Sequence, residues 1–406
     1  MSDRAMMPDS GDAARVRHLA ELDECEIGIE KLVAGGDGMG RFGGLPIFVP
    51  CAAPGDRLRV RVVERRRRYA RAEILEILVA GGGRRSPPCP HFSRCGGCDL
   101  QHLEDEIQTD LKVDAARETL RYIGGLSLPA TQRVLRGAPW GYRLRTQLHL
   151  EEGEGAPQVG YYERGSHRLV AIESCPVLAP PLEHFVVGLS GRLRDNIPSR
   201  LDVALGDDGA LTCAPTIDDL PRGEVISRVD GRSYVYDART FFQSHRDLLG
   251  DLIRTVVSAA TGTCAYDLYA GVGLFSLALA ERYERVVAVE GDRNAARYLR
   301  KNTRLARLAN IEVVGASVEV AVKTLPAAVE RIIVDPPRAG LGFRVRSDIF
   351  DRRARHLTYV SCHPAVLARD LKHLCRIYTL CELVFLDLFP QTGHIEVVAQ
   401  LQLNEK

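Results

Sequence analysis

From Ser244 to the end of the chain, short apolar segments of strand character alternate with segments of helical periodicity, and this alternation is the strongest constraint on the fold. The strand segments are, in order, TCAYDLYA, RVVAVEG, IEVVGAS, RIIVDPP, HLTYVSC, LCELVFLDLF and HIEVVAQLQL. Helical segments such as 293–308 and 364–375 lie between most of them. The last two strand segments are separated only by PQTGH, which predicts a hairpin. The pattern predicts an α/β fold with a seven-stranded, mostly parallel, doubly wound sheet that contains one antiparallel strand.

The first strand of this sheet ends in YDLYAGVGLF, a turn typical of nucleotide-type ligand sites. Gly271 and Gly273 let the backbone approach a ligand at the N-terminus of the following helix. Glu290 ends the next strand, where a carboxylate can bind a ribose diol. Phe275 and Ser276 occupy the region in which a dinucleotide fingerprint has its third glycine, so no pyrophosphate is expected. S-adenosylmethionine fits this pattern, because it has a ribose and an adenine but no phosphate.

A lone G-x-G turn also occurs in α/β proteins of other functions. Its combination with Asp267, Tyr269, Glu290 and the terminal hairpin favours a class I, Rossmann-like, S-adenosylmethionine-dependent methyltransferase over that alternative. Asp335 ends the fourth strand in VDPPRAGLG, at the same carboxyl edge and beside the predicted cofactor site. Arg338 stands where an amino-methyltransferase is expected to carry an aromatic residue, so a different target atom is indicated.

Two reactive side chains occur at later strands. Cys362 ends the fifth strand, just before a helix, where the macrodipole favours a thiolate and hence a nucleophile. Glu396 begins the last apolar strand, where a carboxylate is costly to bury unless it is used. A thiolate can add to carbon 6 of a uracil and activate carbon 5 toward a methyl donor, and a base then removes the carbon 5 proton. The pair predicts methylation of a uracil at carbon 5.

The segment from residue 23 to residue 79 contains five short alternating runs separated by glycine-rich turns. These runs predict a small, closed or nearly closed, OB-like β-barrel. The formal net charge of the chain is only +1, yet residues 57–71 hold eight arginines and one glutamate. Alternation along this run puts Leu58 and Val60 on one face and the arginines on the other. A phosphate-binding surface is predicted, with a solvated charge run as the alternative.

The 11 cysteines of the chain fit a reducing compartment, in which disulfides are rare. Cys89, Cys95 and Cys98, in CPHFSRCGGC, have the close spacing of metal ligands, and they leave a tetrahedral site one ligand short. Spacing alone leaves zinc and an iron–sulfur cluster as alternatives. Burial as small hydrophobic residues is predicted for a further six cysteines, namely Cys25, Cys51, Cys213, Cys264, Cys375 and Cys381.

Several motifs together resemble those of one family, the RNA (uracil-C5)-methyltransferases that carry an N-terminal TRAM barrel and an iron–sulfur cluster, best known from 23S ribosomal RNA. The motifs are CPHFSRCGGC, ESCPVL, RTFFQSH, DLYAGVGLF, VDPPR, VSCHP and HIEVVAQL. The resemblance implies that Cys362 is the nucleophile and that Glu396 is the proton acceptor. The residues that it implies around the cofactor and the uracil, together with the two glycines of the turn, are Gln243, Tyr269, Gly271, Gly273, Glu290 and Asp335.

The resemblance also implies a fourth cluster ligand, Cys175 in ESCPVL. With Cys89, Cys95 and Cys98 it would hold a [4Fe–4S] cluster of structural rather than redox role. Two positions depart from the family pattern, because many relatives carry Asn where this chain has Leu274 and His363. Leu274 cannot make that polar contact with the cofactor and is left out of the predicted site.

The predicted domain organisation has four parts. Residues 1–22 are expected to form a flexible tail, 23–79 the RNA-binding TRAM barrel, 80–243 an iron–sulfur and central antiparallel β domain, and 244–406 the methyltransferase domain. Within residues 80–243, a helix over 103–123 is expected to pack toward the catalytic domain.

The expected partner is RNA, and ribosomal RNA is favoured over the alternative, tRNA. A signal-peptide core and an apolar run of about 18 residues are not found in the sequence, so a cytoplasmic monomer without a membrane partner is expected. An alternative of another class is a non-catalytic RNA-binding or chaperone protein that has kept the fold. Intact Cys362, Glu396, Gly271 and Gly273 argue against it.

Overall fold

The computed structural model describes residues 24–153, 156–194, 197–258, 260–326 and 329–405. The predicted tail over residues 1–22 lies outside these ranges. The chain divides into two units. Unit 1 contains residues 1–88, 98–115 and 391–393, and unit 2 contains residues 89–97, 116–390 and 394–406. None of the helices in the described ranges has the length and apolar character needed to cross a membrane.

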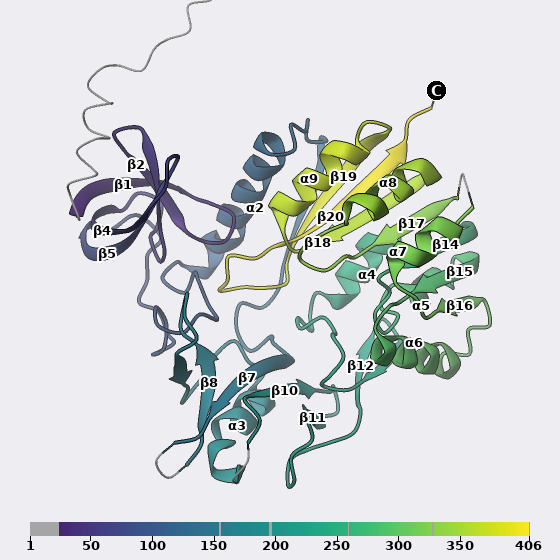
Figure 1. The fold of residues 1–406 in the computed structure, drawn as a ribbon, viewed down its shortest axis with the longest axis horizontal. Coiled ribbons are helices and arrows are strands. Elements are labelled where there is room, and N and C mark those ends of the chain that lie inside the picture. Colours follow the sequence, from purple (N-terminus) through teal and green to yellow (C-terminus); the bar gives the residue numbers. More distant parts are fainter. Residues whose placement is uncertain (1–23, 154–155, 195–196, 259, 327–328, 406) are drawn as a thin grey trace, which may run out of the picture. The chain divides into compact units, whose positions relative to one another are not determined.

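Unit 1 contains the predicted five-stranded barrel, drawn in purple in Figure 1. It closes in the order β1-β2-β3-β5-β4. Its strands are β1 (Glu24–Leu32), β2 (Gly38–Phe42), β3 (Leu45–Val49), β4 (Arg57–Arg65) and β5 (Ala70–Val79). Leu58 and Val60 are fully buried, whereas the arginines that alternate with them along β4 are exposed. The predicted closed barrel and the alternation along β4 are therefore confirmed.

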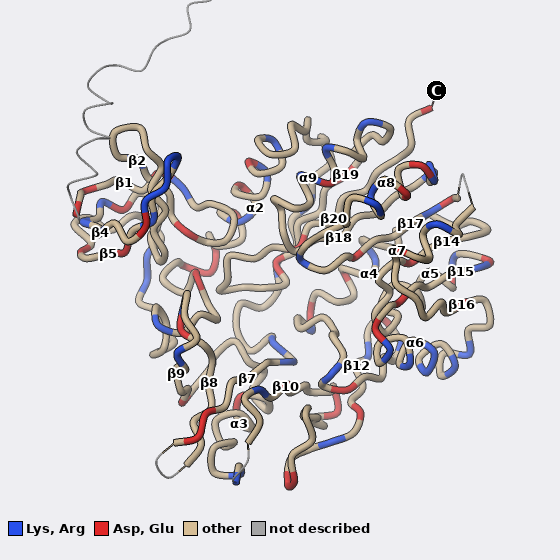
Figure 2. Tube along the Cα trace, in the orientation of Figure 1, with Lys and Arg blue, Asp and Glu red and all other residues tan. Residues whose placement is uncertain are grey.

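The outer face of the barrel is less basic than residues 57–71 suggest. Arg59 pairs with Glu76 and Arg61 with Glu73, each at 2.5 Å, because β5 runs antiparallel to β4 and presents glutamates opposite the arginines. The turn between β4 and β5 remains strongly basic, as Figure 2 shows. Within the described part of the chain, the exposed residues 67–68 of this turn form no ion pair.

A buried carboxylate fastens the chain where it leaves the barrel. The side chain of Asp56 is 1% exposed and accepts hydrogen bonds from the backbone N–H groups of Ala53 and Gly81, at 2.6 and 2.9 Å. The Arg84 guanidinium donates to both of its oxygens, at 2.6 and 2.8 Å. Burial by itself would raise the pKa of Asp56, but these hydrogen bonds outweigh it and lower the pKa.

Unit 1 also includes three residues of a distant hairpin, Gln391–Gly393. Gln391 is fully buried at a φ of +67°, and its carbonyl accepts from the backbone N–H groups of Asp99 and Leu100, at 2.8 and 3.0 Å. Its side-chain amide bonds with that of Gln108 at 3.0 Å. A residue far along the sequence thus completes the hydrogen bonding of the segment that follows Cys98.

Unit 2 is built on an eight-stranded sheet in the order β16-β15-β14-β17-β18-β20-β19-β6, green to yellow in Figure 1 apart from β6. Its strands are β14 (Gly262–Leu268), β15 (Tyr283–Val289), β16 (Ile311–Val314), β17 (Arg331–Val334), β18 (His356–Ser361), β19 (Tyr378–Asp387), β20 (Glu396–Leu403) and β6 (Thr131–Arg136). Strand β20 runs antiparallel to both of its neighbours, as predicted.

The prediction of seven strands is incomplete. The seven strands from 262 to 403 are present, but β6 adds an eighth, parallel to β19. Residues 131–136 were expected in the antiparallel region instead. A strand edge left open on β19 would expose unpaired backbone groups, and β6 satisfies them. A six-residue alternating segment does not itself reveal which sheet it joins.

Unit 2 also contains helices and short 3-10 turns. They are α3 (Pro180–Val187), η1 (Ser190–Arg192), α4 (Leu249–Val257), α5 (Ser276–Leu279), α6 (Arg293–Leu305), α7 (Val318–Ala321), η2 (Val322–Thr324), α8 (Phe343–Arg352) and α9 (Pro364–Leu374). Helix α2 (Asp105–Tyr122) passes from unit 1 into unit 2. In its unit 2 part, Arg117 bonds the Gln132 amide at 2.9 Å and lies 5.5 Å from the centre of the Phe385 ring.

A separate antiparallel sheet of unit 2 has the order β11-β10-β7-β8-β9. Its strands are β7 (Arg145–Glu151), β8 (Gln158–Tyr162), β9 (Leu169–Ala171), β10 (Arg200–Leu205) and β11 (Leu211–Ala214), and a two-stranded hairpin follows with β12 (Val225–Val229) and β13 (Arg232–Tyr236). The predicted central antiparallel region is confirmed for these strands.

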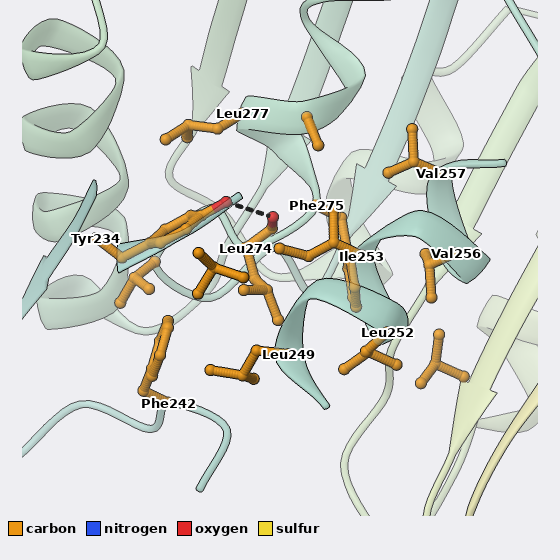
Figure 3. Packing of buried hydrophobic residues seen from close by; sticks show 14 of the residues in the cluster. Tyr234, Phe242, Leu249, Leu252, Ile253, Val256, Val257, Leu274, Phe275 and Leu277 are labelled. Atoms are coloured by element: carbon orange, nitrogen blue, oxygen red, sulfur yellow. Dashed lines mark hydrogen bonds between the residues drawn. The ribbon is translucent and has the colours of Figure 1, made fainter. Parts of the chain in front are cut away.

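The core between β13, α4 and the glycine turn holds the turn in place (Figure 3). The Tyr234 hydroxyl donates to the Leu274 carbonyl at 3.1 Å, and the Leu274 side chain is buried in this core. Asn302, fully buried in α6, donates to the carbonyls of Val235 and Val272 at 3.1 and 3.0 Å. Leu274, the position that departs from the family pattern, therefore serves packing.

The predicted burial of six cysteines is confirmed at two positions, Cys25 and Cys213. Cys51, Cys264 and Cys375 are only partly buried, and Cys381 in β19 is exposed. Side chains alternate along a strand, and Leu380, next to Cys381, takes the inward place.

Asp56→Ala should lower the free energy of unfolding of the barrel by about 3 kcal/mol, because the Arg84 charge and two backbone N–H groups lose their acceptor. Since the pKa of Asp56 is lowered, this stabilisation is present at neutral pH and is lost as pH falls below the ordinary carboxyl range. Native-state hydrogen exchange of barrel amides in the full chain measures it. Glu73→Ala, which breaks an exposed pair, should cost less than about 1 kcal/mol. Equal effects of the two substitutions would contradict this account.

Candidate active site at the carboxyl edge of the sheet

The predicted glycine turn follows β14, and its two glycines adopt backbone angles that other residues rarely adopt. Gly271 and Gly273 have φ angles of +56° and +100°. A Cβ at Gly273 would lie 2.6 Å from Leu299 Cδ1, so close packing requires glycine there. A Cβ at Gly271 would meet nothing within 4 Å. The turn therefore packs tightly on the protein side at Gly273 and borders open space at Gly271. Tyr269, just before it, also has a positive φ, +66°.

Glu290 follows β15 and holds the turn from the side. One of its oxygens accepts the Gly271 N–H at 2.7 Å, and the other accepts the Asp292 N–H at 2.6 Å. Burial raises the pKa of Glu290, although these two hydrogen bonds act in the opposite direction. The predicted cofactor residues Gly271 and Glu290 are thus in direct contact.

Two further carboxylates lie at the same edge, and neither has a cationic partner in the described residues. Asp267, fully buried at the end of β14, accepts from the Ser276 hydroxyl at 2.5 Å, and its Oδ1 has no hydrogen-bond partner among the described residues. Burial raises the pKa of Asp267 to about 7. Asp335, after β17, has its pKa raised to about 7 by burial and by Asp267. The Oε1 of Gln243 is likewise buried without a partner in the described ranges.

These groups form a site that lacks charge complementarity until something binds. A buried carboxylate with no cation or full set of donors costs free energy, and such groups are found where a ligand supplies the missing partner. A ligand with a positive charge and hydrogen-bond donors would satisfy Asp267 and Asp335 together. The sequence interpretation named Asp335 and Gln243 but did not include Asp267 among the site residues, although Asp267 begins the motif it relied on.

Cys362 lies between β18 and α9, half-buried. Burial raises its pKa to about 11, the Glu396 carboxylate adds to this, and the Arg338 guanidinium acts against it. The helix end does not decide the ionisation of this thiol in the free protein, because burial and a neighbouring carboxylate have the larger effect. His363, the N-cap of α9, accepts the Val366 N–H on its ring nitrogen at 3.4 Å.

Glu396, 3% exposed, begins β20. Its neighbour Val397 pairs with Ser361 in the antiparallel ladder of β18 and β20, so Glu396 and Cys362 are the next residues along the two strands. Burial raises the pKa of Glu396 well above its ordinary value, and Asp335 raises it further. The two reactive side chains predicted from separate motifs are thus brought together.

Arg338 provides the positive charge at this pair. It lowers the pKa of both Cys362 and Glu396, and its guanidinium lies 3.3 Å from the His394 ring nitrogen. The sequence interpretation used Arg338 only to exclude an aromatic residue and did not consider His394. The signal was present, because both residues stand in motifs that were singled out, but their proximity depends on the fold.

The predicted cluster ligands are distributed over both units. Cys89, Cys95 and Cys175 belong to unit 2 and Cys98 to unit 1. Burial raises the pKa of Cys175 to about 11, and Cys89 and Cys95 raise it further, so these three thiols are near enough to affect one another. Within the described residues no three His, Cys, Asp or Glu side chains form a ready-made metal site. The cluster stays a prediction.

Comparison with known proteins bears on these observations. Residues 224–404 match the tRNA (uracil-5-)-methyltransferase family model, and residues 22–75 match the TRAM domain model. The chain is 32% identical to the 23S rRNA (uracil(1939)-C(5))-methyltransferase RlmD of Alkalilimnicola ehrlichii, over 96% of this chain and 98% of the relative. It is 34% identical to the RlmD of Chromohalobacter salexigens, over 91% of this chain and 87% of the relative.

A solved structure shares the fold. The Pyrococcus abyssi tRNA (uracil-54, C5)-methyltransferase, crystallised with S-adenosyl-L-homocysteine, superposes with a TM-score of 0.70. It is 24% identical and covers 92% of this chain and 100% of its own. The full-length similarity to the two RlmD proteins and the two matching family models show that the chain belongs to the TRAM-domain RNA (uracil-C5)-methyltransferase family.

Proposed function

We propose that this protein transfers a methyl group from S-adenosylmethionine to carbon 5 of a uridine in RNA, through a covalent bond between Cys362 and carbon 6. The observation that carries the proposal is the meeting of Cys362 and Glu396 on neighbouring strands, with Arg338 beside both. A thiol nucleophile and a buried carboxylate base are the two groups that methylation of this carbon requires.

The residues at the carboxyl edge fit S-adenosylmethionine. Glu290, Gly271 and Tyr269 would hold the ribose side, and Asp267, Asp335 and Gln243 would face the charged end, whose partners are missing in the free site. Gly273 keeps the turn packed on the core. When bound, this cofactor supplies a methyl group on a cationic sulfonium.

The chain's own residues carry out the remaining steps. The Cys362 thiol releases its proton to solvent, which Arg338 favours. The sulfur then forms a bond to carbon 6 while the uracil ring takes up the electron pair as an enolate. Carbon 5 then accepts the methyl group. Glu396 as carboxylate takes the carbon 5 proton, the ring double bond re-forms, and the sulfur leaves as a thiolate. A raised pKa makes the ionised Glu396 a stronger base, which suits removal of a proton from carbon.

We propose the following division of labour. Residues 23–79 bind RNA, 80–243 carry an iron–sulfur cluster, and 244–406 transfer the methyl group. The basic turn at residues 67–68 supports RNA binding by the barrel.

The proposed substrate is 23S ribosomal RNA, which the similarity to the two RlmD relatives supports. The alternative is tRNA, which the family model that matches residues 224–404 favours. A cytoplasmic location is part of the proposal, because these RNA classes are found there.

Cys362→Ala and Glu396→Gln should give opposite results with the same RNA. Without the thiol, carbon 6 is not attacked, so Cys362→Ala should neither methylate RNA nor form an adduct. Without the base, attack and methyl transfer proceed but the carbon 5 proton stays, so Glu396→Gln should accumulate a methylated protein–RNA adduct. Denaturing gel electrophoresis with radiolabelled methyl groups measures both.

The RNA class is read in the same assay, by mapping 5-methyluridine after incubation of wild-type protein with 23S ribosomal RNA or with tRNA. An adduct formed by Cys362→Ala, or wild-type turnover by Glu396→Gln, would contradict the assigned roles. RNA binding with no methylation of either RNA by the wild type would instead favour a non-catalytic RNA-binding protein.

Affinity for S-adenosylmethionine should depend on pH more strongly than affinity for S-adenosylhomocysteine, which lacks the sulfonium charge. The pKa values of Asp267 and Asp335 are about 7 in the free protein, so both are largely ionised above pH 7 and become neutral below it. The preference for the sulfonium should therefore be largest above about pH 7 and decline as pH falls. Calorimetric titration with each ligand measures it, and parallel pH dependences would refute this assignment.

Cys89, Cys95, Cys98 and Cys175 should hold one [4Fe–4S] cluster, because four thiolates are its usual ligand set. Protein purified without oxygen should contain about four irons and four sulfides per chain. Cys175→Ala should lose the iron and lower the melting temperature, since metal binding contributes to folding. Cys213→Ala, which alters a buried cysteine outside the set, should keep the iron. One zinc per chain without labile sulfide would show a zinc site instead.

A further inference from the structure

Asp370, in α9, is a fully buried carboxylate that the proposed chemistry does not use. Its Oδ2 accepts the Leu341 N–H at 2.9 Å and the Tyr359 hydroxyl at 2.7 Å. Its Oδ1 accepts from Arg346 Nη1 at 2.6 Å and from Arg369 Nε at 2.9 Å. One side chain therefore joins α9 to β18, to α8 and to the segment that precedes α8.

That segment, residues 335–342, connects β17 to α8 and lies against α9. Arg369 Nη2 donates to the carbonyls on either side of Gly340, at 3.0 and 3.2 Å. Gly340 has a φ of +74°, and a Cβ there would lie 2.2 Å from Val366 Cγ1. The backbone of the segment thus packs directly on α9 at Gly340, where there is no room for a side chain. The Asp370 carboxylate binds the next backbone N–H, that of Leu341.

The segment carries the groups that control ionisation at the site. Of the groups that act on the Cys362 thiol, Glu396 on β20 and Asp335 raise its pKa and Arg338 lowers it. The ring of His394 contacts Arg338, and His363 follows Cys362 along the chain. The Arg338 side chain is exposed, so its charge stays near the thiol only if its backbone is held. Cys362 itself precedes α9, the helix on which the segment is seated.

We propose that Asp370 is a positioning residue, which clamps segment 335–342 to α9 and thereby keeps Arg338 beside Cys362 and Glu396. The proposal rests on the proposed function, in which ionised Cys362 attacks the uracil. If the clamp is lost, Arg338 is no longer held near the thiol, and the thiolate forms only at higher pH. Nucleophile and base stay in place, so the attack recovers once the pH is high enough.

The test is the pH dependence of adduct formation with RNA that carries 5-fluorouridine at the target, since fluorine cannot leave as a cation and the adduct is trapped. Asp370→Asn should move the midpoint of the rate–pH profile upward by about one pH unit and return toward the wild-type rate at high pH. Arg338→Met should move the midpoint at least as far. The double variant should move it no further than Arg338→Met alone, because Asp370 acts through Arg338.

Two controls make the outcome decisive. Asp351→Asn removes an exposed carboxylate of α8 and should keep the wild-type midpoint. If Asp370→Asn does not fold, Arg369→Met loosens the clamp from its exposed side and should shift the midpoint in the same direction. An unchanged midpoint with a lower rate at every pH, or additive shifts in the double variant, would overturn the proposal. Failure of the wild type to form any adduct would overturn the proposed function instead.

Discussion

Strand β20 runs antiparallel between β18 and β19, and the candidate site depends on that register. The pairing of Ser361 with Val397 makes Cys362 and Glu396 the next residues on the two strands. A slip of one residue would turn Glu396 to the other face of the sheet. The register is well specified, because Val397 and Val398 are both fully buried, one on each face of β20, and both sides of the strand are apolar.

The buried carboxylates at the same edge have a cost in stability. Burial raises the pKa of Asp267 and Asp335 to about 7, so the free folded chain holds protons that the unfolded chain releases. The free energy of unfolding is therefore highest, as far as these two groups are concerned, at acid pH. It falls as pH rises from the ordinary carboxyl range through about 7, because ionising the buried groups is costly. A cationic ligand reverses this loss by providing the missing charge. The carboxylates of the site therefore destabilise the protein most when no ligand is bound, which is typical of groups arranged for binding rather than for folding.

Pairing with glutamates changes the electrostatic effect of the arginines on the barrel. Counted along the sequence, the arginines of β4 suggest a continuous phosphate-binding face. In the structure, Glu73 and Glu76 of β5 stand opposite Arg61 and Arg59 and neutralise them. Among the described residues of the barrel, unpaired positive charge is concentrated at the β4–β5 turn (Figure 2). Exposed pairs of this kind contribute little stability, so their main effect is on the electrostatic field of the barrel face.

Features that depend on local spacing could be predicted from the sequence. The barrel, the glycine turn, Cys362 after β18 and Glu396 at the start of β20 follow from periodicity and from short motifs, because each needs only a few neighbouring residues. Strand β6 could not be assigned to the large sheet, since its six residues carry no information about a partner some 250 residues away. The same holds for Gln391, which folds into unit 1 although it stands between two strands of unit 2.

The chemistry of the site follows from tertiary packing. Whether Cys362 is a thiol or a thiolate depends on burial, on Glu396 and on Arg338, which come from different strands and loops, and the balance is opposite to that expected from the helix end alone. The clamp at Asp370 is likewise invisible in the sequence, because its donors come from β18, α8, α9 and the segment before α8. Solvent exclusion and long-range electrostatics arise when distant segments pack together, so no local pattern along the chain records them.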